Sequence, residues 1–408
     1  MGMIINIDKA LELRTDYNIL REPLNALLQE RQEAFEKSNP IDYLFVRNSI
    51  SSFQETYTSS IGFAHALTET SDYAVAPIYN TAEGFSATYR TRTFQGGFII
   101  TQQTLEDGQV GKIKDDATRF ITRWNGDIVE YAMKAISAGF GEVVTFGETG
   151  NGQSRLSLKS ADTTDGDINT VTKNDLFCKS HKTVKRDGVD AISQSNIFRA
   201  VDSGGSKITI GGSDPSQIAK LADYINQVIT IMENYKDDNG KYAGVDGPKT
   251  IVCANDAHLK AAINAALSMD MFGQFPNPAK GKATLLDTPY LRDIPQCAAG
   301  NGFFIVDKSY NEANHGPELT ERIPLTMNVK ETTNPYGISY DARQRFDINC
   351  ASWRGIVYCL LGDTSNTSTD WNHADKFTTI TVTDTIVKPV SVVGTVTTEG
   401  VAEEATGT

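Results

Sequence analysis

The chain has 408 residues, of which 39% are hydrophobic and 22% charged, and its formal net charge is −13. This is a globular composition, which excludes a wholly disordered or fibrous chain and predicts two to three domains of roughly 150 residues each. The negative charge excludes a protein that holds DNA by neutralising phosphates, because that requires a basic surface. Five widely spaced cysteines indicate free thiols in a reducing compartment, and no apolar run is long enough to cross a membrane.

Residues 1–60 predict an N-terminal arm built around one amphipathic helix. Pro23 suits the first position of that helix, and Asn39-Pro40 ends it. A single amphipathic helix cannot form its own core, so its apolar face must contact the rest of the chain or another chain. The residues predicted to make this contact are Leu24, Leu27, Leu28 and Phe35.

Residues 61–104 lose the helical period and predict a long β-hairpin that projects as an extended loop. The polar turn 80–84 separates an apolar stretch from residues 85–100, which alternate as a strand does. Because a two-stranded hairpin is marginally stable in water, we expect it to lie on a neighbouring copy. The residues predicted to contact that copy are Tyr79, Phe85, Tyr89, Arg90, Arg92 and Phe94.

The clearest helix lies within residues 105–209, at 105–138. Its apolar residues recur at steps of three and four, and Gly139 and Gly141 end it. Gly108 and Gly111 are expected to separate a short first turn. The residues predicted to form the packing face of this helix are Phe120, Trp124, Ile128 and Tyr131. After this helix the chain becomes rich in Gly, Ser, Thr and Asp, which predicts an irregular insertion.

Residues 210–325 predict a compact α+β domain. Asp214 can cap a helix that Pro215 opens, and a buried strand at 250–254 leads to Asn255, a natural cap for a helix over 256–268. A further strand is expected at 303–306. The alternation of helices and strands is typical of one mixed layer structure.

Two segments follow that domain. Residues 326–362 return to strands, which we expect to join the sheet under the long helix. Residues 363–408 form a Thr- and Val-rich tail with two basic residues against seven acidic ones. The default interpretation of this tail is an end without fixed structure. The alternative is that residues 377–387, which alternate like a strand, bind to a neighbouring copy.

A search for catalytic groups finds no convincing centre. Cys178 and His181 are close in sequence, but a zinc site needs a second pair and a nucleophile pair needs spatial adjacency. The interpretation favoured is one buried thiol and one turn histidine. Asp162, Asp165 and Asp167 lack the spacing of a calcium loop and indicate a solvated turn. We therefore predict a protein that is not an enzyme, with no catalytic residue, metal ligand or cofactor.

The arm, the hairpin and the tail are surfaces that require partners, which indicates self-assembly. The order of parts resembles the major capsid proteins of tailed bacteriophages, which have the Hong Kong 97 fold. The resemblance rests on Thr81–Phe85, Tyr89–Arg92 and Gly96–Asp107, which lead into the long helix from Ile113 to Ala138. The stretch Asp175–His181 and the strand at 250–254 with its following helix are also similar to this family.

The resemblance implies an α+β, Hong Kong 97-like fold with an N-terminal arm, an extended loop, a peripheral domain with a spine helix, and an axial domain. It implies homo-hexamers and pentamers that form the icosahedral head of a virion assembled in the host cytoplasm, without a membrane. The head would enclose double-stranded DNA without sequence-specific binding. Separate scaffolding and portal proteins, and in some members decoration proteins, are the implied partners.

Two departures from the family pattern give expectations. Some members join subunits covalently through a lysine on the extended loop, but here no lysine occurs between Lys37 and Lys112. We therefore expect no such cross-link at this loop. Some members also carry a cleaved N-terminal scaffolding segment, and since only the arm precedes the hairpin here, we expect a separate scaffolding protein or none fused at this end.

Three alternatives stay open on the sequence. The first is the shell protein of a cellular, encapsulin-type nanocompartment with the same fold, which packaged DNA or a cargo enzyme would distinguish. The second is a hydrolase that uses Cys178 and His181. The third is a β-rich surface or tail protein, against which the long helix and the reduced cysteines argue.

Overall fold

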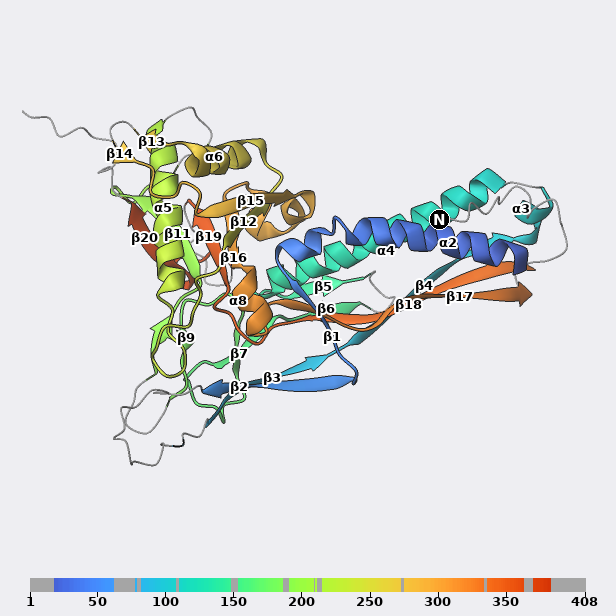
Figure 1. Ribbon diagram of the computed structural model, residues 1–408, viewed down its shortest axis with the longest axis horizontal. Helices are drawn as coiled ribbons and strands as arrows, with labels where there is room; N and C mark the ends of the chain where they lie inside the picture. The colour runs from blue at the N-terminus through green and yellow to red at the C-terminus, as the bar shows by residue number, and fades with distance from the viewer. Residues whose placement is uncertain are drawn as a thin grey trace, which may run out of the picture.

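The computed structural model describes residues 18–61, 78, 82–107, 110–147, 153–185, 191–208, 210, 215–272, 275–333, 336–362 and 370–382. The fold is α+β, as predicted, and has two main parts (Figure 1). We call the six-stranded sheet and the helices around it the body. We call the four-stranded sheet and the helices that cover it the limb, because it extends from one side of the body.

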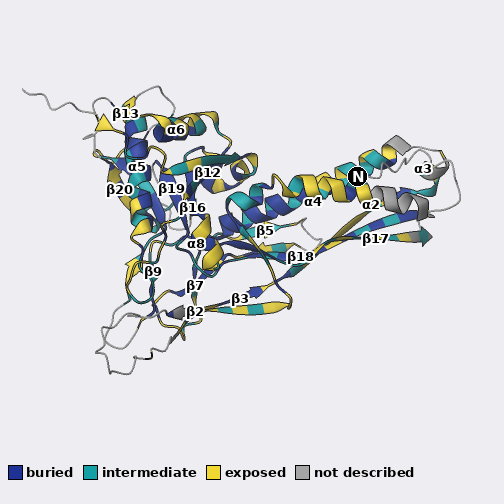
Figure 2. Ribbon diagram, viewed as in Figure 1, coloured by how far each residue is buried: buried dark blue, intermediate teal, exposed yellow. Residues whose placement is uncertain are grey.

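The sheet of the body has the strand order β15-β12-β16-β19-β11-β20. Its strands are β15 (Ala283–Thr288), β12 (Lys249–Ala254), β16 (Gly302–Asp307), β19 (Ile356–Leu361), β11 (Ile197–Asp202) and β20 (Thr378–Val382). β16 runs antiparallel to both its neighbours, whereas β11 runs parallel to β19 and β20. Every residue of β16 and β19 is buried, so this sheet is covered on both faces, as Figure 2 shows.

Different helices cover the two faces of this sheet. Successive side chains of a strand point to opposite faces. Phe303 of β16 packs against Tyr224 of α5 (Pro215–Glu233), while Phe304 packs with Tyr358. Tyr358 also meets Phe140, which follows the long helix α4 (Val110–Ala138), at 4.8 Å between ring centroids. The long helix therefore ends against the face opposite α5, and this contact joins the limb to the body.

The predicted capping of the second body helix is off by one residue. α6 (Ala257–Ser268) is capped by Asp256, whose carboxylate accepts from the backbone N–H groups of His258 and Leu259, and not by Asn255. Asn and Asp are equally good caps, so the sequence Asn-Asp leaves the choice to the backbone. The predicted cap Asp214 lies outside the described residues, and α5 opens at Pro215.

The limb is a sheet of order β1-β17-β18-β4 with helices on one face. Its strands are β1 (Val46–Ser49), β17 (Glu318–Thr333), β18 (Tyr336–Asn349) and β4 (Arg92–Thr101), and its helices are α2 (Asn18–Glu36), α3 (Gln102–Glu106) and α4. On β18, Ile338, Tyr340, Ala342 and Gln344 alternate as buried residues beneath the helices. The exposed positions on the other face are mostly polar, with Ile99 of β4 as an apolar exception.

The arm helix differs from the sequence prediction at its start, whereas the long helix has the separate short first turn that was predicted. α2 begins at Asn18, so Pro23 lies inside the helix and not at its first position. The long helix is interrupted before Val110, with α3 as the separated first turn, and its 29 residues span about 44 Å at 1.5 Å each. It ends at Ala138, and Gly141 adopts the left-handed φ of +81° that turns the chain away.

The predicted hairpin is replaced by a different pairing. β2 (Gln54–Ile61) pairs antiparallel with β3 (Ala82–Arg90), and we call these two strands the ribbon. Residues 82–84 lie in β3, so the predicted turn at 80–84 is wrong, and residues 85–100 divide at Thr91 into β3 and β4. β4 pairs instead with β18 in the limb. Alternation of side chains persists through both strands, so it cannot show where a chain changes sheets.

The remaining elements are short and connect the ribbon, the body and the limb. The paired strands are β5 (Val144–Phe146) with β6 (Ser154–Leu156), β7 (Lys159–Thr163) with β8 (Lys173–Asp175), β9 (His181–Lys182) with β10 (Ser193–Gln194), and β13 (Met271–Phe272) with β14 (Phe275–Pro276). The short helices are η1 (Pro40–Tyr43), η2 (Pro289–Asp293), α7 (Pro295–Ala298), α8 (Lys308–Ala313) and η3 (Ala374–Lys376).

Two predicted segment assignments are corrected by the sheets. β19, expected among the return strands 326–362 under the long helix, is a central strand of the body. β20, expected in a bland or neighbour-clamping tail, pairs with β11 of its own chain, and Phe377 and Val382 are buried. The alternation at 377–387 did predict a strand here, but it could not predict the partner, because the pairing is with residues about 180 positions earlier in the chain. Residues 383–408 lie outside the described residues.

Because Phe377 is 1% exposed in the core of the body, Phe377→Ala should lower the free energy of unfolding by about 3–5 kcal/mol. Thr381→Ala, an exposed position on β20, which begins one residue after Phe377, is the matched control and should change it little. Chemical denaturation followed by tryptophan fluorescence measures both. Equal midpoints for the two variants would show that the strand does not belong to the folded core.

Candidate functional site

The inner face of the ribbon packs on its own chain. Ile61, Phe85, Ala87 and Tyr89 form a small core with Ala161 and Val184. Tyr89 is 1% exposed, its ring lies 4.7 Å from that of Tyr57, and its hydroxyl donates to the carbonyl oxygen of His315 at 3.4 Å. Burial raises the pKa of Tyr89 far above the ordinary value, so the hydroxyl stays protonated and can donate. Phe85 and Tyr89 are thus interior residues, and their predicted role as contacts to another copy is wrong for this conformation.

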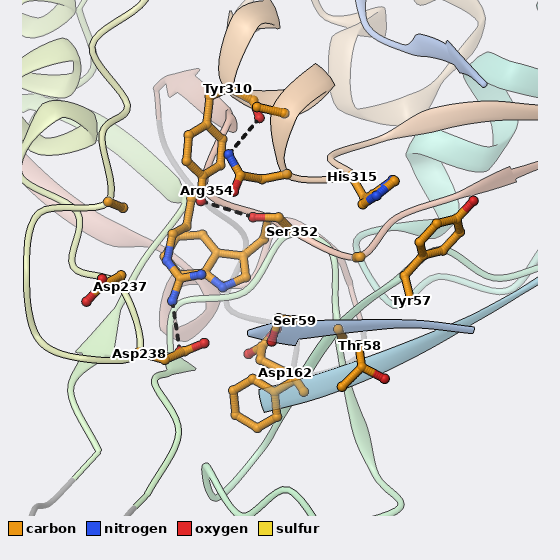
Figure 3. Close-up of a pocket in the computed structure, with 17 residues that line it drawn as sticks. Tyr57, Thr58, Ser59, Asp162, Asp237, Asp238, Tyr310, His315, Ser352 and Arg354 are labelled. Carbon is orange, nitrogen blue, oxygen red and sulfur yellow. Dashed lines mark hydrogen bonds and ion pairs between the residues drawn. The ribbon is translucent and has the colours of Figure 1, made fainter. Parts of the chain in front are cut away.

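The ribbon packs against a turn in which His315 has a strained backbone conformation. His315, after α8, has a φ of +50°, which a non-glycine residue adopts only with support from its surroundings. Its carbonyl oxygen also accepts from the backbone N–H groups of Ala351 and Ser352 at 2.8 and 3.0 Å. The ring centroids of His315 and Tyr57 are 4.1 Å apart. Nδ1 of His315 is 3.5 Å from a carboxylate oxygen of the buried Glu318. Figure 3 shows His315 and Tyr57 on the same side of the cleft described below. Burial raises the pKa of Glu318, and the nearby His315 partly offsets this rise.

The outer face of the ribbon carries exposed polar side chains. Ser86, Thr88 and Arg90 alternate with the buried residues of β3, and Arg90 donates to Gln54 of β2 at 3.1 Å. Arg90 is thus available at the surface. Tyr79 lies outside the described residues. The ribbon is therefore covered by its own chain on one face only.

Arg92 and Phe94 lie where the ribbon passes into the limb. The Arg92 guanidinium contacts Asp347 at 2.9 Å and donates to the carbonyl oxygen of Arg155 at 3.1 Å. Tyr131 of α4 donates to the other oxygen of Asp347 at 2.5 Å. Phe94 stacks on Phe346 at 4.5 Å. Arg92 thus binds a carboxylate of its own chain, and not the partner's carboxylate that the sequence predicted. Asp347 was missed because it is remote in sequence and nothing near it marks it.

The selected residues of the long helix lie over the limb sheet. Phe120 packs on Phe98 at 5.1 Å between centroids, and Trp124 donates from its indole nitrogen to Gln344 at 3.0 Å. Ile128 and Tyr131 are buried where the helix nears the body. Tyr131 packs edge-on against Phe346 at 5.5 Å.

The arm helix lies against the long helix of its own chain. Leu28 is buried with Ile113, Ala117 and Ile121, whereas Leu27 is half-buried. Phe35 is partly buried against the main core, and the side chain of Leu24 lies outside the described residues. The sequence left open a contact with the same chain or with another chain, and the described part of this face contacts its own chain.

A polar cleft of about 450 Å³ lies between the ribbon, α8 and the body (Figure 3). Arg354 crosses it, stacked over Trp353, and contacts Asp238 at 3.2 Å and the carbonyl oxygen of Lys236 at 2.9 Å. Figure 3 shows Asp237, Asp238 and Arg354 on one side of this space and Tyr57 and His315 on the other. Arg354 is paired with Asp238, Asp162 is paired with His181 behind the cleft, and Asp237 accepts from the backbone N–H groups of Asn239 and Lys241, which suits a structural junction.

Behind the cleft lies a buried polar network that holds His181. Its Nδ1 atom is 3.0 Å from a carboxylate oxygen of Asp162, its Nε2 atom is 3.1 Å from Oδ1 of Asn196, and its ring stacks on Trp353 at 4.2 Å. Asp162 also accepts from Ser160 and from Asn174, the latter at 2.6 Å. His181 and Asn196 are fully buried, in strands and turns that the sequence gives no reason to bring together.

The partners of Asn196 determine the protonation of His181. The amide nitrogen of Asn196 donates to the carbonyl oxygen of Leu176 at 2.7 Å, and its Oδ1 accepts from the backbone N–H of Cys178 at 3.0 Å. Oδ1 is therefore an acceptor, and Nε2 of His181 must donate to it. Nδ1 lies beside the carboxylate of Asp162, whose oxygens also accept hydrogen bonds from Ser160 and Asn174, so Nδ1 must donate to it. Both ring nitrogens carry protons, and His181 forms a buried ion pair with Asp162.

This arrangement does not support a Cys/His nucleophile. Both nitrogens of His181 face Asp162 and Asn196, and the Cys178 sulfur accepts from the backbone N–H of Ser180 at 3.4 Å. Burial raises the pKa of Cys178, which is opposite to what a thiolate nucleophile needs. Asp165 and Asp167 cap their own turn through Thr170 and Asn169. Within the described residues, no cluster of His, Cys, Asp or Glu could hold a metal.

No family model and no curated protein matches the sequence. Among solved structures, the mature capsid of bacteriophage PhiM1 is similar at TM-score 0.43 and 8% identity, over 79% of this chain and 86% of that chain. Mycobacterium phage Patience is similar at 0.43 and 11%, over 85% and 88%. A virus-like particle from Pyrococcus furiosus is similar at 0.41 and 8%, over 83% and 98%. Among the described residues, no helix is both long and apolar enough to cross a membrane.

The Asp162–His181 pair predicts a specific acid response. Burial alone would raise the pKa of Asp162, but His181, Ser160 and Asn174 lower it below the ordinary 3.8. Its contribution to stability is therefore present above about pH 4 and is lost as the pH falls through the lowered pKa. Asp162→Asn should destabilise the protein at pH 7 by roughly 3–5 kcal/mol, and the gap to the wild type should narrow in acid.

Urea denaturation between pH 7 and pH 3 tests this, with Asp115→Asn as the control because Asp115 is exposed on α4. A gap between the wild type and Asp162→Asn that stays constant with pH would contradict the buried ion pair.

Removal of the Arg92 side chain should leave Asp347 without its counter-charge. Burial already raises the pKa of Asp347, and Arg92 opposes that rise. Arg92→Met should therefore lower the free energy of unfolding by about 1–3 kcal/mol at pH 7. Asp347→Asn in the same chain should recover part of the loss, since the amide carries no charge. Additive effects in this double-mutant cycle would refute a direct interaction.

Proposed function

We propose that the chain is the major capsid protein of a tailed, double-stranded DNA bacteriophage and self-assembles into the hexamers and pentamers of an icosahedral head. The observation that carries the proposal is the limb, a long sheet covered by helices on one face only, together with a ribbon whose outer face is exposed. A compact enzyme has no need of such extended, half-covered parts. A shell subunit needs them, because each must reach several neighbours.

The energetics of the described surfaces agree with this function. The exposed positions of the ribbon and limb are mainly polar, so each contact between copies would be modest. A closed lattice makes many such contacts at once, and each contact raises the effective concentration of the next. Weak individual contacts also allow wrongly placed subunits to leave before the shell closes. A subunit with polar half-covered surfaces thus stays soluble alone and becomes stable in a shell.

The net charge of −13 also suits a container for DNA. An acidic wall repels the phosphates of packed DNA, so the genome does not adhere to the shell that must later release it. This supports enclosure without sequence-specific binding. The proposal includes a separate scaffolding protein, a portal protein, location in the virion and assembly in the host cytoplasm, all of which rest on the family resemblance.

Negative-stain electron microscopy of the purified full chain tests the proposal. We expect uniform icosahedral shells or free capsomers, and nuclease-protected DNA in particles taken from infected cells. Uniform shells filled with a cargo enzyme in place of DNA would identify the nanocompartment alternative. A monomer at high concentration, under conditions where the chain is folded by circular dichroism, would refute both shell functions.

The sequence of the loop predicts how the shell is held together. Since no lysine lies between Lys37 and Lys112, the ribbon and its connecting residues 62–81 have no amine side chain with which to form an isopeptide bond. We therefore expect mature particles to dissolve in hot detergent to single chains without a ladder of linked subunits. A ladder of covalent oligomers on the denaturing gel, resistant to reducing agent, would contradict this expectation.

A further inference from the structure

The outer edge of β17 is open along most of its length. β17 has 16 residues, and on the side away from β18 its partner is β1, which pairs only with Glu318–Glu321. On the other side β18 pairs with β17 up to its end. Among the described strands, none pairs with the outer side of Leu325–Glu331. An open edge presents a row of backbone N–H and C=O groups that can pair with another strand.

This edge has little of the protection that soluble proteins give to exposed strands. Such edges are commonly guarded by proline, by bulges or by lysine. Here Pro324 and the two register shifts of β17 lie before Thr326. Beyond them the charged residues are Lys330, which pairs with Asp341 of β18 at 3.2 Å, and its neighbour Glu331. The central residues from Leu325 to Val329 are uncharged, so a partner strand meets no repulsion there.

An unfilled groove of about 250 Å³ accompanies the open edge. It lies between the arm helix, the long helix and the helix-facing side of β17. Oε1 of Gln32 is buried there without a hydrogen-bond partner. The lining consists of Leu28, Gln29, Gln32, Ile121, Leu325 and Met327. A strand added beside β17 would direct alternate side chains into this groove, so the open backbone edge and the groove indicate the same kind of occupant.

We propose that this occupant is β17 of a second copy, added antiparallel across a two-fold axis that passes near Asn328. The inference rests on the proposed self-assembly and specifies one of its interfaces. It joins two four-stranded limb sheets into one continuous sheet of eight strands. The contact is closed and symmetric, because each copy offers the same segment to the other.

The alternation along β17 favours its own copy as the partner. A two-fold axis perpendicular to the sheet keeps each face on its own side, so the helix-facing residues of the two copies lie opposite one another, with Leu325 opposite Glu331. Leu325, Met327 and Val329 face the helices and are half-buried, whereas Thr326, Asn328 and Lys330 are exposed on the other face. With the axis at Asn328, Met327 lies opposite Val329 of the other copy. Lys330 then lies opposite Thr326 and not opposite another lysine, which avoids a like-charge pair.

Cysteine substitution tests both the pairing and its register. Residues directly opposite in an antiparallel pair have Cβ atoms about 4.5–5.5 Å apart, close to disulfide distance. Asn328→Cys alone should therefore give a disulfide-linked dimer in assembled particles on a non-reducing gel. Thr326→Cys and Lys330→Cys should each give little dimer alone and a dimer when the two variants are co-assembled. The native cysteines give little background, because four are buried and Cys178 is half-buried.

The controls separate this inference from the proposed function. Thr93→Cys, exposed on β4 at the opposite edge of the sheet, should not form the dimer, and Asn328→Ser shows the effect of losing the amide alone. Particle formation is scored in the same samples by sedimentation. Shells without an Asn328→Cys dimer overturn the inference and leave the capsid function standing. Failure of the wild-type chain to form shells overturns both. Shells in which Thr93→Cys cross-links as strongly as Asn328→Cys also overturn it.

Discussion

The contact of Arg92 with Asp347 lies where three parts of the molecule meet. Arg92 is the first residue of β4, just after the ribbon, and Asp347 lies near the end of β18. Tyr131 brings the long helix to the same carboxylate. The contact therefore fixes the direction in which the chain leaves the ribbon and enters the limb. It also fixes the helix over the sheet, and the stacked rings of Phe94 and Phe346 fill the space beside it.

The Arg92–Asp347 and Asp162–His181 ion pairs stabilise different kinds of structure. The Arg92 site is partly exposed and joins two strands of the limb sheet to the long helix, whereas the Asp162–His181 site is buried and holds short strands and turns. Backbone groups in irregular segments need partners, and Asn196 bonds two of them, on Leu176 and Cys178, as well as the ring of His181. A buried charge is tolerated there because its counter-charge and hydrogen bonds are complete. The cleft beside it, which holds the Arg354–Asp238 pair, belongs to the same structural junction.

Periodicity predicted the elements that are long and one-sided. The helix at 110–138, α5 with its apolar face, and the strands β12 and β16 follow from spacing alone, because burial of one face or both faces leaves a regular pattern. The sheet partners did not follow. Residues 85–100 alternate without a break, yet Thr91 divides them between two sheets, and β19 is as apolar as a strand of either sheet would be. Pairing depends on contacts between residues far apart in the chain, which local spacing does not record.

The same limit applies to the surfaces. Apolar and aromatic residues of the ribbon were predicted to face another copy, but a ribbon with one apolar face satisfies that face first on the nearest core, which is its own. What remains for other copies is then polar side chains and open backbone edges. Backbone edges carry direction and register but little hydrophobic area, so they form ordered contacts only when many copies hold one another in place. A limb with one covered face and one open edge is therefore stable as a single chain, and its remaining backbone groups find partners only in an assembly.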